Sequence, residues 1–356
     1  LFVNQEHVGP LALEIDPEGL LFKPTTRTEG ACATSSLAIY NAAYAVASGR
    51  FKNVLALGVE KMSLLNTQGV THALSCCSYW PTEGAGGMTF PGLFAELGTA
   101  YQEKHGISDD QLRTMLAHVS ALNYRNGIQN PLAHFGPGSL PDKNQLVTAE
   151  AILNLPDSGK GSNPMIAPPL RLHDCSLITD GAAAVVLTSS ENAKSNFKHA
   201  VELSGIGHVT DRMMLNGRQG RLHELQATKH AVTQACTEAG IGIGDLDFAE
   251  VHDCFTVNEL LCAEAIGLSL PGRAGFDVME GKFDPDSDCP INLSGGLKSK
   301  GHPVGATGAS MHALAYKQLT GAPIGVAAKG TPETAMTVNI GGSGVTNCVS
   351  VLRRIQ

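Results

Sequence analysis

The chain has 356 residues, of which 43% are hydrophobic and 16% are charged, and its formal net charge is −8. This length and composition indicate a folded protein with a large core and exclude an intrinsically disordered chain. The acidic balance argues against a nucleic-acid surface, and the lack of any apolar run of about 18 residues argues against a membrane span. Nine cysteines without a C-x-x-C pair indicate a reducing compartment and favour neither a disulfide framework nor a structural zinc site.

The first regular element in chain order is a helix of small and apolar residues at 34–48, which Gly49 ends. Because almost every position is small or apolar, we expect this helix to be buried nearly all round. A short apolar run at 53–60 follows it and is typical of a buried strand. A turn, a buried helix and a buried strand in this order predict a layered α/β unit.

The stretch from about 64 to 172 is rich in Gly, Pro and Asn and predicts an inserted, loop-rich subdomain. Two helices are expected within it, at 93–106 and 108–126. Ser108 is the expected N-cap of the second helix.

The α/β pattern resumes after this stretch. We expect strands at 180–189, 200–209 and 346–352 and helices at 227–240, 258–266 and 306–319. Strand and helix signals alternate towards both ends of the chain, which favours α/β layers over segregated α+β packing. A glycine-flanked turn opens a small-residue helix both at Cys32 and after 301, which hints at two related halves.

Cys32 lies in the stretch EGACATSS, directly before the helix at 34–48. Unpaired N–H groups and the positive end of the dipole at a helix N-terminus lower the pKa of a thiol and favour the thiolate. The alternative is a small buried side chain that only fills the core. This stretch alone leaves both interpretations open.

The stretch EVHDCFTVNELL, residues 250–261, follows an apolar segment and precedes a helix. His252 and Cys254 therefore lie on a strand-to-helix turn, where α/β folds commonly carry their chemistry. His252 could donate a hydrogen bond to a developing oxyanion, and Cys254 could shuttle a proton. The alternative is a histidine with satisfied hydrogen bonds beside a buried thiol.

Two glycine-rich segments follow. In SGGLKSKGHPVGATGA, residues 294–309, glycines on both sides of His302 allow a ligand to approach closely, so His302 is a candidate general base. In NIGGSG, residues 339–344, backbone N–H groups can form an anion-binding nest or an oxyanion hole. This second loop matches neither a dinucleotide fingerprint nor a P-loop, so no dinucleotide or ATP site is expected there.

With these four segments in this order, the sequence resembles the thiolase superfamily, whose members carry C-x-S, N-E-A-F, G-H-P and C-x-G loops. The first reads C-A-T-S at 32–35, with the hydroxyl residue shifted by one, and G-H-P is intact at 301–303. The other two depart from the common pattern and read H-D-C-F at 252–255 and N-I-G at 339–341. H-D-C-F marks the sterol-carrier-protein-2 (SCP2) type, in which the cysteine of that loop is thought to take over the acid/base role.

This resemblance implies two βαβαβαββ halves in a five-layered αβαβα arrangement with an inserted loop domain. It predicts that 1–63 and 173–197 form the N-terminal half, whose first βαβ segment is missing ahead of residue 1. The loop domain is expected at 64–172 and the C-terminal half at 198–356. Members of the superfamily are typically dimers or tetramers, so a homodimer or homotetramer is expected.

The implied activity is that of a 3-ketoacyl-CoA thiolase of fatty acid β-oxidation and lipid metabolism. Such an enzyme cleaves a 3-oxoacyl-CoA with coenzyme A through a cysteine acyl-enzyme, or runs the reverse Claisen condensation. Coenzyme A and acyl-CoA are its substrates, and no cofactor or metal is expected. A mitochondrial or peroxisomal matrix location is expected, although the end of the sequence lacks the peroxisomal S-K-L signal.

The resemblance also assigns roles to single residues. Cys32 is the nucleophile, His302 its base, and Cys254 the proton shuttle. His252 and His302 stabilise the enolate oxygen, and the backbone N–H groups of Cys32 and Gly341 form a second oxyanion hole. Substrate contacts are assigned to Ser176 and Asn339, with Ser176 against the pantetheine arm.

Two alternatives stay open. A decarboxylating ketoacyl synthase shares the fold and can use a Cys-His-His set, which Cys32, His252 and His302 would supply. The other alternative is a thiolase-like protein that binds acyl-CoA without useful turnover. It is suggested because the C-A-T-S stretch matches C-x-S only loosely and because the cysteine of the C-x-G motif is missing. The remaining cysteines are interpreted as packing residues: Cys76, Cys77, Cys175, Cys236, Cys262, Cys289 and Cys348.

Overall fold

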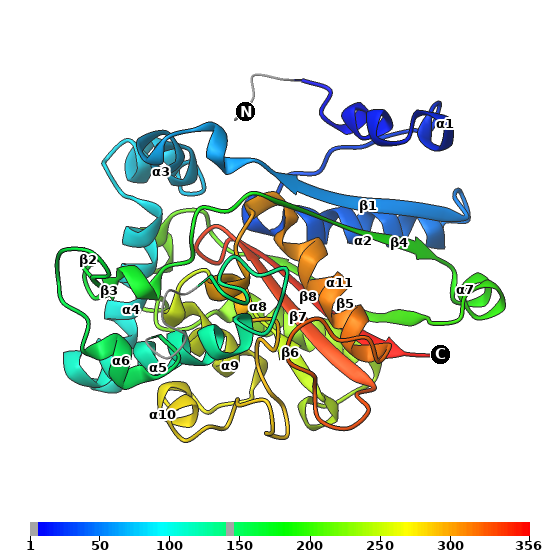
Figure 1. Cartoon of the computed structure of the whole chain (residues 1–356). Helices are drawn as coiled ribbons and strands as arrows, with labels where there is room; N and C mark the ends of the chain where they lie inside the picture. Colours follow the sequence, from blue (N-terminus) through cyan, green and yellow to red (C-terminus); the bar gives the residue numbers. More distant parts are fainter. Residues whose placement is uncertain (1–5, 140–145) are drawn as a thin grey trace.

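The computed structural model describes residues 6–139 and 146–356, whose main layers are two β-sheets (Figure 1). The first sheet pairs β1 (Asn53–Glu60) with β4 (Gly181–Thr188) in antiparallel orientation. The second sheet has the order β5-β8-β7-β6; its β6–β7 pair is parallel and its other two pairs are antiparallel. Its strands are Val201–Thr210 (β5), Phe248–Glu250 (β6), Thr334–Gly341 (β7) and Thr346–Arg354 (β8).

Helices fill the space between the sheets and cover one outer side. The helix α2 (Thr34–Ala47) packs on β1 and β4, and α11 (Thr307–Leu319) packs on α2 and on strands of both sheets. Beyond the second sheet, α8 (Gln226–Ala239) packs on β5 and β8, and α9 (Thr256–Ile266) packs on α8 (Figure 1). These β-α-β-α layers belong to the predicted αβαβα arrangement, and the α/β fold is confirmed.

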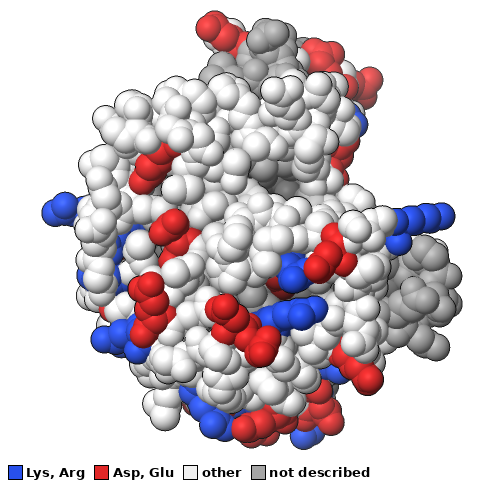
Figure 2. All heavy atoms as spheres, turned by 90° about the vertical axis from the view of Figure 1, so that its left-hand side faces the viewer, with Lys and Arg blue, Asp and Glu red and all other residues white. Residues whose placement is uncertain are grey.

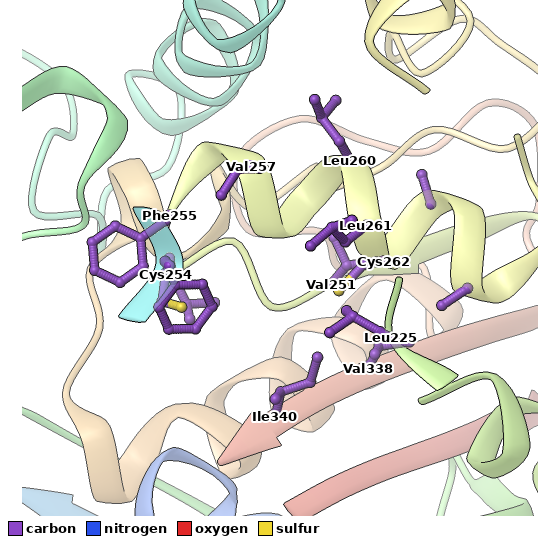
Figure 3. Close-up of a cluster of buried hydrophobic side chains, with 14 of the residues drawn as sticks. Leu225, Val251, Cys254, Phe255, Val257, Leu260, Leu261, Cys262, Val338 and Ile340 are labelled. Carbon is purple, nitrogen blue, oxygen red and sulfur yellow. The ribbon is translucent and has the colours of Figure 1, made fainter. Parts of the chain in front are cut away.

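The largest apolar cluster joins α9 to β7. Figure 3 shows it, with Leu261 on the side of α9 that faces Val338 of β7 and Leu260 on the opposite side of the helix. Every residue of β7 is buried, because helices cover both faces of this sheet. The packing of α9 against the sheet therefore holds the H-D-C-F loop, which directly precedes this helix, in place.

The chain between β1 and β4 forms the left-hand part of the molecule in Figure 1. The helix α5 begins with a capping box in which the side chains of Ser108 and Gln111 each accept a backbone N–H, which confirms Ser108 as its N-cap. The placement of this region agrees with an inserted loop domain, while the boundaries at 64–172 and between the halves stay predictions. The elements of this region are α3 (Thr67–Ser75), α4 (Phe90–His105), α5 (Asp109–Gly127), α6 (Ala149–Leu153), β2 (Met165–Ala167) and β3 (Leu170–Arg171).

Most expected elements are present at or near their expected positions, including the strand at 53–60 and the helix at 227–240, which Gly240 ends in a left-handed conformation. The remaining short helices are α1 (Pro17–Leu20), α7 (Ser190–Asn196) and α10 (Ala274–Met279).

Two expectations about burial are wrong. The helix α2 is not buried all round, because Asn41 is exposed and the side chain of Tyr44 is 54% exposed. The strand β1 is buried on one face only, and Leu55 and Val59 on its other face are 45% and 58% exposed. Composition predicts that these segments are apolar, but their burial depends on what packs on each side.

Charged side chains of both signs are interspersed on the face shown in Figure 2 and form no continuous basic patch there. Across 6–139 and 146–356, each helix is either too short or too polar to cross a lipid bilayer. All nine cysteines are free thiols.

Candidate active site

Cys32 lies in a 3-10 turn, Ala31–Ala33, at the start of α2, and its side chain is fully buried. The turn is held by two side chains: Glu29 accepts the N–H of Ala31, and Thr34 Oγ1 accepts the N–H of Gly30 and donates to the carbonyl of Ala31. The hydroxyl of Thr34, which stands at the serine position of the C-x-S motif, therefore has a structural role in fixing the loop.

Burial raises the pKa of the Cys32 thiol well above its ordinary value, and ionised Cys77 and Glu60 would raise it further. The backbone N–H groups of Gly342 and of Cys32 itself act in the opposite direction, because they hydrogen bond the sulfur. The lowering expected at the helix N-terminus is therefore present but is outweighed by desolvation, and the pKa is raised overall. The resting group is a thiol, and a base must take its proton.

His252 and His302 lie beside this thiol. The sulfur of Cys32 and one ring nitrogen from each histidine lie within 4.8 Å of one another. The two rings are perpendicular, with centroids 5.1 Å apart. Within the described part of the chain, neither histidine Nε2 atom has a hydrogen-bond partner although both are buried. Three loops far apart in sequence thus converge on one small centre.

Each histidine is held through its Nδ1 atom. His302 Nδ1 lies 2.7 Å from Thr307 Oγ1, and His252 Nδ1 lies 3.1 Å from Asn339 Nδ2. Burial lowers the pKa of His302 to about 3, and the charge of Lys300 adds to this effect. Burial also lowers the pKa of His252 well below its ordinary value, with His302 and Lys300 adding to it. Both rings are therefore neutral at physiological pH.

These three atoms are close enough to hold a metal ion. A histidine that binds a metal through one ring nitrogen normally donates the other N–H to an acceptor. His302 has such an acceptor in Thr307, but His252 faces the amide donor of Asn339. The ligand set of this centre therefore does not fit a metal ion. We interpret it as a centre for proton transfer.

Cys254 is fully buried next to this centre. Burial raises the pKa of its thiol well above the ordinary value, and the largest charge effect that adds to it is that of ionised Cys32. The loop is fixed by the carboxylate of Asp253, which accepts the backbone N–H groups of Leu297 and Lys298 at 2.6 and 3.0 Å. Asp253 thereby joins the H-D-C-F loop to the segment that leads to G-H-P.

The role of Gly341 as an oxyanion donor stays a prediction. The backbone N–H of Gly342 lowers the pKa of the Cys32 thiol, while Gly341 ends β7 and pairs with Thr346. A Cβ at Gly341 would clash with the carbonyl of Gly30 on the Cys32 loop, so a side chain is excluded there. The buried guanidinium of Arg218 holds the next residue, Ser343, through its carbonyl and its hydroxyl.

The two residues predicted to contact substrate differ in their surroundings. Ser176 is half-buried and donates its backbone N–H to the carbonyl of Cys254 at 2.9 Å, so it lies beside the centre, and its contact with pantetheine stays a prediction. Asn339 is fully buried, and its amide bonds Cys32, His252 and Ser36. Both amide hydrogens of Asn339 are thus directed to groups of the protein, and its contact with substrate stays a prediction.

Several supporting residues were not identified from the sequence. Gly342 could have been found, because NIGGSG was already read as a nest of backbone donors. Ser36 and Asp253 carry no local signal, because their partners Asn339 and Leu297 lie far away in the chain. Lys300 and Thr307 have partners only ten and five positions away, within or next to the G-H-P segment, and could have been found there.

A group of buried charges lies behind the histidines. Glu250, Asp253 and Glu259 are buried carboxyls, and burial raises the pKa of each. Lys300 is a buried ammonium whose pKa burial lowers, and its Nζ atom donates to Ser310 at 2.9 Å. Its position next to the G-H-P loop explains its effect on both histidines.

A cavity of about 670 Å³ lies on the other side of the G-H-P loop, lined by Lys300, Gly301 and Pro303 and by parts of β4 and α11. Cys32, His252 and Cys254 do not line it. This cavity is therefore not the reacting centre.

Comparisons with known proteins agree with this arrangement. A family model described as thiolase C-terminal domain-like matches residues 207–354. An acetyl-CoA acetyltransferase from Methanothermobacter thermautotrophicus is 37% identical over 354 residues, which are 99% of this chain and 86% of that protein. Sterol carrier protein 2 from Rattus norvegicus is 29% identical over 85% of this chain and 54% of its own length. A monomeric SCP2-thiolase like protein type 1 from Mycobacterium smegmatis matches with a TM-score of 0.65 and 20% identity, over 91% of this chain and 61% of that structure.

Proposed function

This chain belongs to the thiolase superfamily, with relatives of the SCP2 type, and is an acyltransferase; we propose that it cleaves 3-oxoacyl-CoA with coenzyme A, or runs the reverse condensation. One observation carries the proposal. The Cys32 thiol lies within 4.8 Å of ring nitrogens from His252 and His302, with Cys254 beside it. A buried thiol, a neutral base and a second thiol are the groups that this reaction needs.

In the first half of the proposed reaction, His302 takes the proton of Cys32 as the sulfur adds to the 3-oxo carbon. Collapse of the resulting alkoxide breaks the bond between carbons 2 and 3. The acyl group stays on Cys32, and the electron pair leaves as the enolate of acetyl-CoA or propionyl-CoA. His252 and protonated His302 donate to the enolate oxygen, and the Cys254 thiol protonates carbon 2.

In the second half, the Cys254 thiolate takes the proton of the incoming coenzyme A. The new thiolate adds to the thioester carbonyl of the acyl-enzyme. Its oxyanion is placed against the backbone N–H groups of Cys32 and Gly342, which already surround the sulfur. Collapse releases acyl-CoA and the Cys32 thiolate, which recovers its proton from His302.

A decarboxylating ketoacyl synthase is the second candidate, because Cys32, His252 and His302 form a Cys-His-His set. Cys254 favours the thiolase reading, since a decarboxylating condensation needs no second thiol. A protein that binds acyl-CoA without turnover is less well supported. Thr34 in the C-x-S position and Asn339 in the C-x-G position both make specific hydrogen bonds that hold the Cys32 loop. A homodimer or homotetramer, a role in fatty acid β-oxidation and a matrix location belong to the same proposal.

The test is a spectrophotometric assay with acetoacetyl-CoA and coenzyme A. We expect the 3-oxoacyl absorbance to disappear with wild-type protein and to persist with Cys32→Ala. Malonyl-CoA with an acyl-CoA primer is the second arm. Release of carbon dioxide from malonyl-CoA, without loss of acetoacetyl-CoA in the first assay, would reject the thiolase and identify the protein as a decarboxylating synthase. Binding of acyl-CoA without turnover in either arm would reject both enzymes.

A further inference from the structure

We propose that Asn339 is a positioning residue that holds the two active-site histidines in opposite tautomers. His252 then presents an N–H toward Cys32, and His302 presents a lone pair. The catalytic consequence rests on the proposed function, whereas the tautomers themselves follow from hydrogen bonds within the protein.

The orientation of the Asn339 amide is fixed by its partner at Cys32, which has only one possible role. Its Nδ2 atom lies 3.1 Å from the carbonyl oxygen of Cys32, and a carbonyl oxygen can only accept. Its Oδ1 atom accepts the hydroxyl hydrogen of Ser36 at 2.7 Å. An exchanged amide would place two oxygens against each other at Cys32, so Nδ2 is the atom that faces His252.

This orientation determines where the hydrogen of His252 lies. The amide nitrogen of Asn339 can only donate, and it lies 3.1 Å from His252 Nδ1. Nδ1 must therefore accept, and in a neutral imidazole the hydrogen is then on Nε2. Burial keeps this ring neutral, and within the described residues its Nε2 has no protein acceptor, so the N–H is free for a substrate oxygen.

His302 is held in the opposite way. Thr307 Oγ1 donates its single hydrogen to the carbonyl of Pro303 at 3.0 Å. The same oxygen lies 2.7 Å from His302 Nδ1, and it has only a lone pair left to offer there. Nδ1 therefore carries the hydrogen, and Nε2 has the lone pair that can accept the proton of Cys32.

The Asn339–His252 contact also joins two departures from the superfamily's common motifs. Asn339 stands where the C-x-G cysteine is usual, and His252 is the first residue of H-D-C-F. The two lie 87 positions apart in the sequence but are in direct contact. We infer that the asparagine is present because the histidine needs a donor at Nδ1.

The test is NMR of protein labelled with ¹⁵N-histidine at neutral pH, with ring signals assigned by His252→Gln and His302→Gln. In wild-type protein we expect the hydrogen on Nε2 of His252 and on Nδ1 of His302. Asn339→Asp replaces the donor by an acceptor and should move the His252 hydrogen to Nδ1. Asn347→Asp is the matched control: Asn347 is equally buried and bonds Thr228 and Gly344. It should leave the His252 signals unchanged.

Steady-state kinetics of Asn339→Asp give a second measurement that is independent of the NMR spectrum. Asn339→Asp should lower kcat for thiolysis by about 100-fold, the usual effect of losing one oxyanion donor, with KM within about threefold of wild type. The same tautomer in both wild-type histidines would overturn the proposal, as would a His252 signal that Asn339→Asp does not change.

If Asn339→Asp does not fold, Thr307→Val provides the second variant. It removes the acceptor of His302 Nδ1, so the His302 ring signals should shift toward a mixture of tautomers while those of His252 stay in place. Unshifted His302 signals in this variant would contradict the assignment. Failure of the proposed function would instead appear as absent wild-type turnover, which the NMR readout does not require.

Discussion

At the scale of single residues, Cys32 is a thiol in the resting protein, and its reactivity depends on a base that removes the proton. Its side chain is fully buried and its pKa is raised, while the pKa of His302 is lowered to about 3. Both shifts favour the uncharged thiol and imidazole over an ion pair. His302 is able to accept a proton at any pH well above 3, so acid inhibition near pH 6 should not come from this residue.

This assignment predicts the pH dependence of alkylation. Because a raised pKa leaves little thiolate at neutral pH, the rate at which iodoacetamide modifies Cys32 should rise about tenfold per pH unit from pH 7 to pH 9. Mass spectrometry of the peptide that contains Cys32 gives this rate apart from the other thiols. A plateau reached below pH 8 would instead indicate a thiolate–imidazolium pair and would contradict the assignment.

Cys254 supplies a second prediction at this scale. Cys254→Ala removes the proton shuttle but leaves Cys32 and its base, so acyl transfer to Cys32 should persist while steady-state thiolysis falls by about 100-fold. Acyl-enzyme should then accumulate, which intact-protein mass spectrometry detects. Cys348→Ala is the matched control, since Cys348 is a buried thiol on β8 with no proposed role in the reaction. Unchanged thiolysis in Cys254→Ala would reject the shuttle.

The sequence predicted which side chains form the active site but not their protonation states. Cys32, His252, Cys254 and His302 were found because each lies in a short stretch with a recognisable neighbourhood. The raised pKa of Cys32 was missed because its complete burial, and the charge effect of Cys77 that adds to it, depend on the folded chain and not on a local pattern. The role of Asn339 was missed for the same reason.

At the scale of elements, the N-termini of α2 and α11 meet at the active site. Ser35 Oγ on α2 accepts the N–H of Ala309 in the first turn of α11 at 2.9 Å, which satisfies a donor that the helix itself leaves free. Gly308 faces Ser36 and Asn339 so closely that a Cβ there would clash with both. The contact between these helices therefore sets the distance between Cys32 and His302.

Gly308→Ala should separate the two helices. Overpacking of this kind commonly costs about 1–3 kcal/mol of folding free energy, and the displaced Asn339 should lower kcat as well. Urea denaturation and the acetoacetyl-CoA assay measure the two effects. Gly244→Ala, at a site where an added Cβ meets nothing within 4 Å, should change neither. Wild-type stability and activity in Gly308→Ala would show that the contact is not tight.

Glu259 on α9 gives a prediction about pH and stability. It is buried, and its Oε2 atom accepts from Asn123 and Asn292 at 2.7 and 2.8 Å. Its pKa is raised by burial, with the charge of Asp253 adding to the shift. The folded state therefore holds a proton that the unfolded state releases above about pH 4.3, so this group lowers stability as pH rises.

Glu259→Gln removes this titration with little change in shape. The free energy of unfolding of the variant relative to wild type should increase between pH 5 and pH 7, by up to about 1.4 kcal/mol per pH unit. Urea denaturation at several pH values measures it. A difference that stays constant with pH, or that decreases as pH rises, would contradict a raised pKa.

At the scale of the whole molecule, the two main β-sheets meet through the layer formed by α2 and α11. The alternation of helix and strand signals was sufficient to predict α/β layers, and the glycine-flanked turns before both helices hinted at the two halves. The exposure of one face of β1 could not be predicted, because an apolar strand has the same sequence whether one face or both are covered. The meeting of Cys32 with His302, 270 positions apart, likewise depends on the complete fold.

The central claim is that Cys32 carries the acyl group, and trapping the acyl-enzyme tests it most directly. Wild-type protein and Cys32→Ala are incubated with acetoacetyl-CoA without free coenzyme A, quenched in acid and digested, and the cysteine peptides are analysed by mass spectrometry. We expect an acetyl group on the Cys32 peptide of the wild-type protein, retained in Cys77→Ala and absent from every peptide of Cys32→Ala. An acetyl group on Cys77 or Cys254 instead, or no acetyl group on any cysteine, would contradict it.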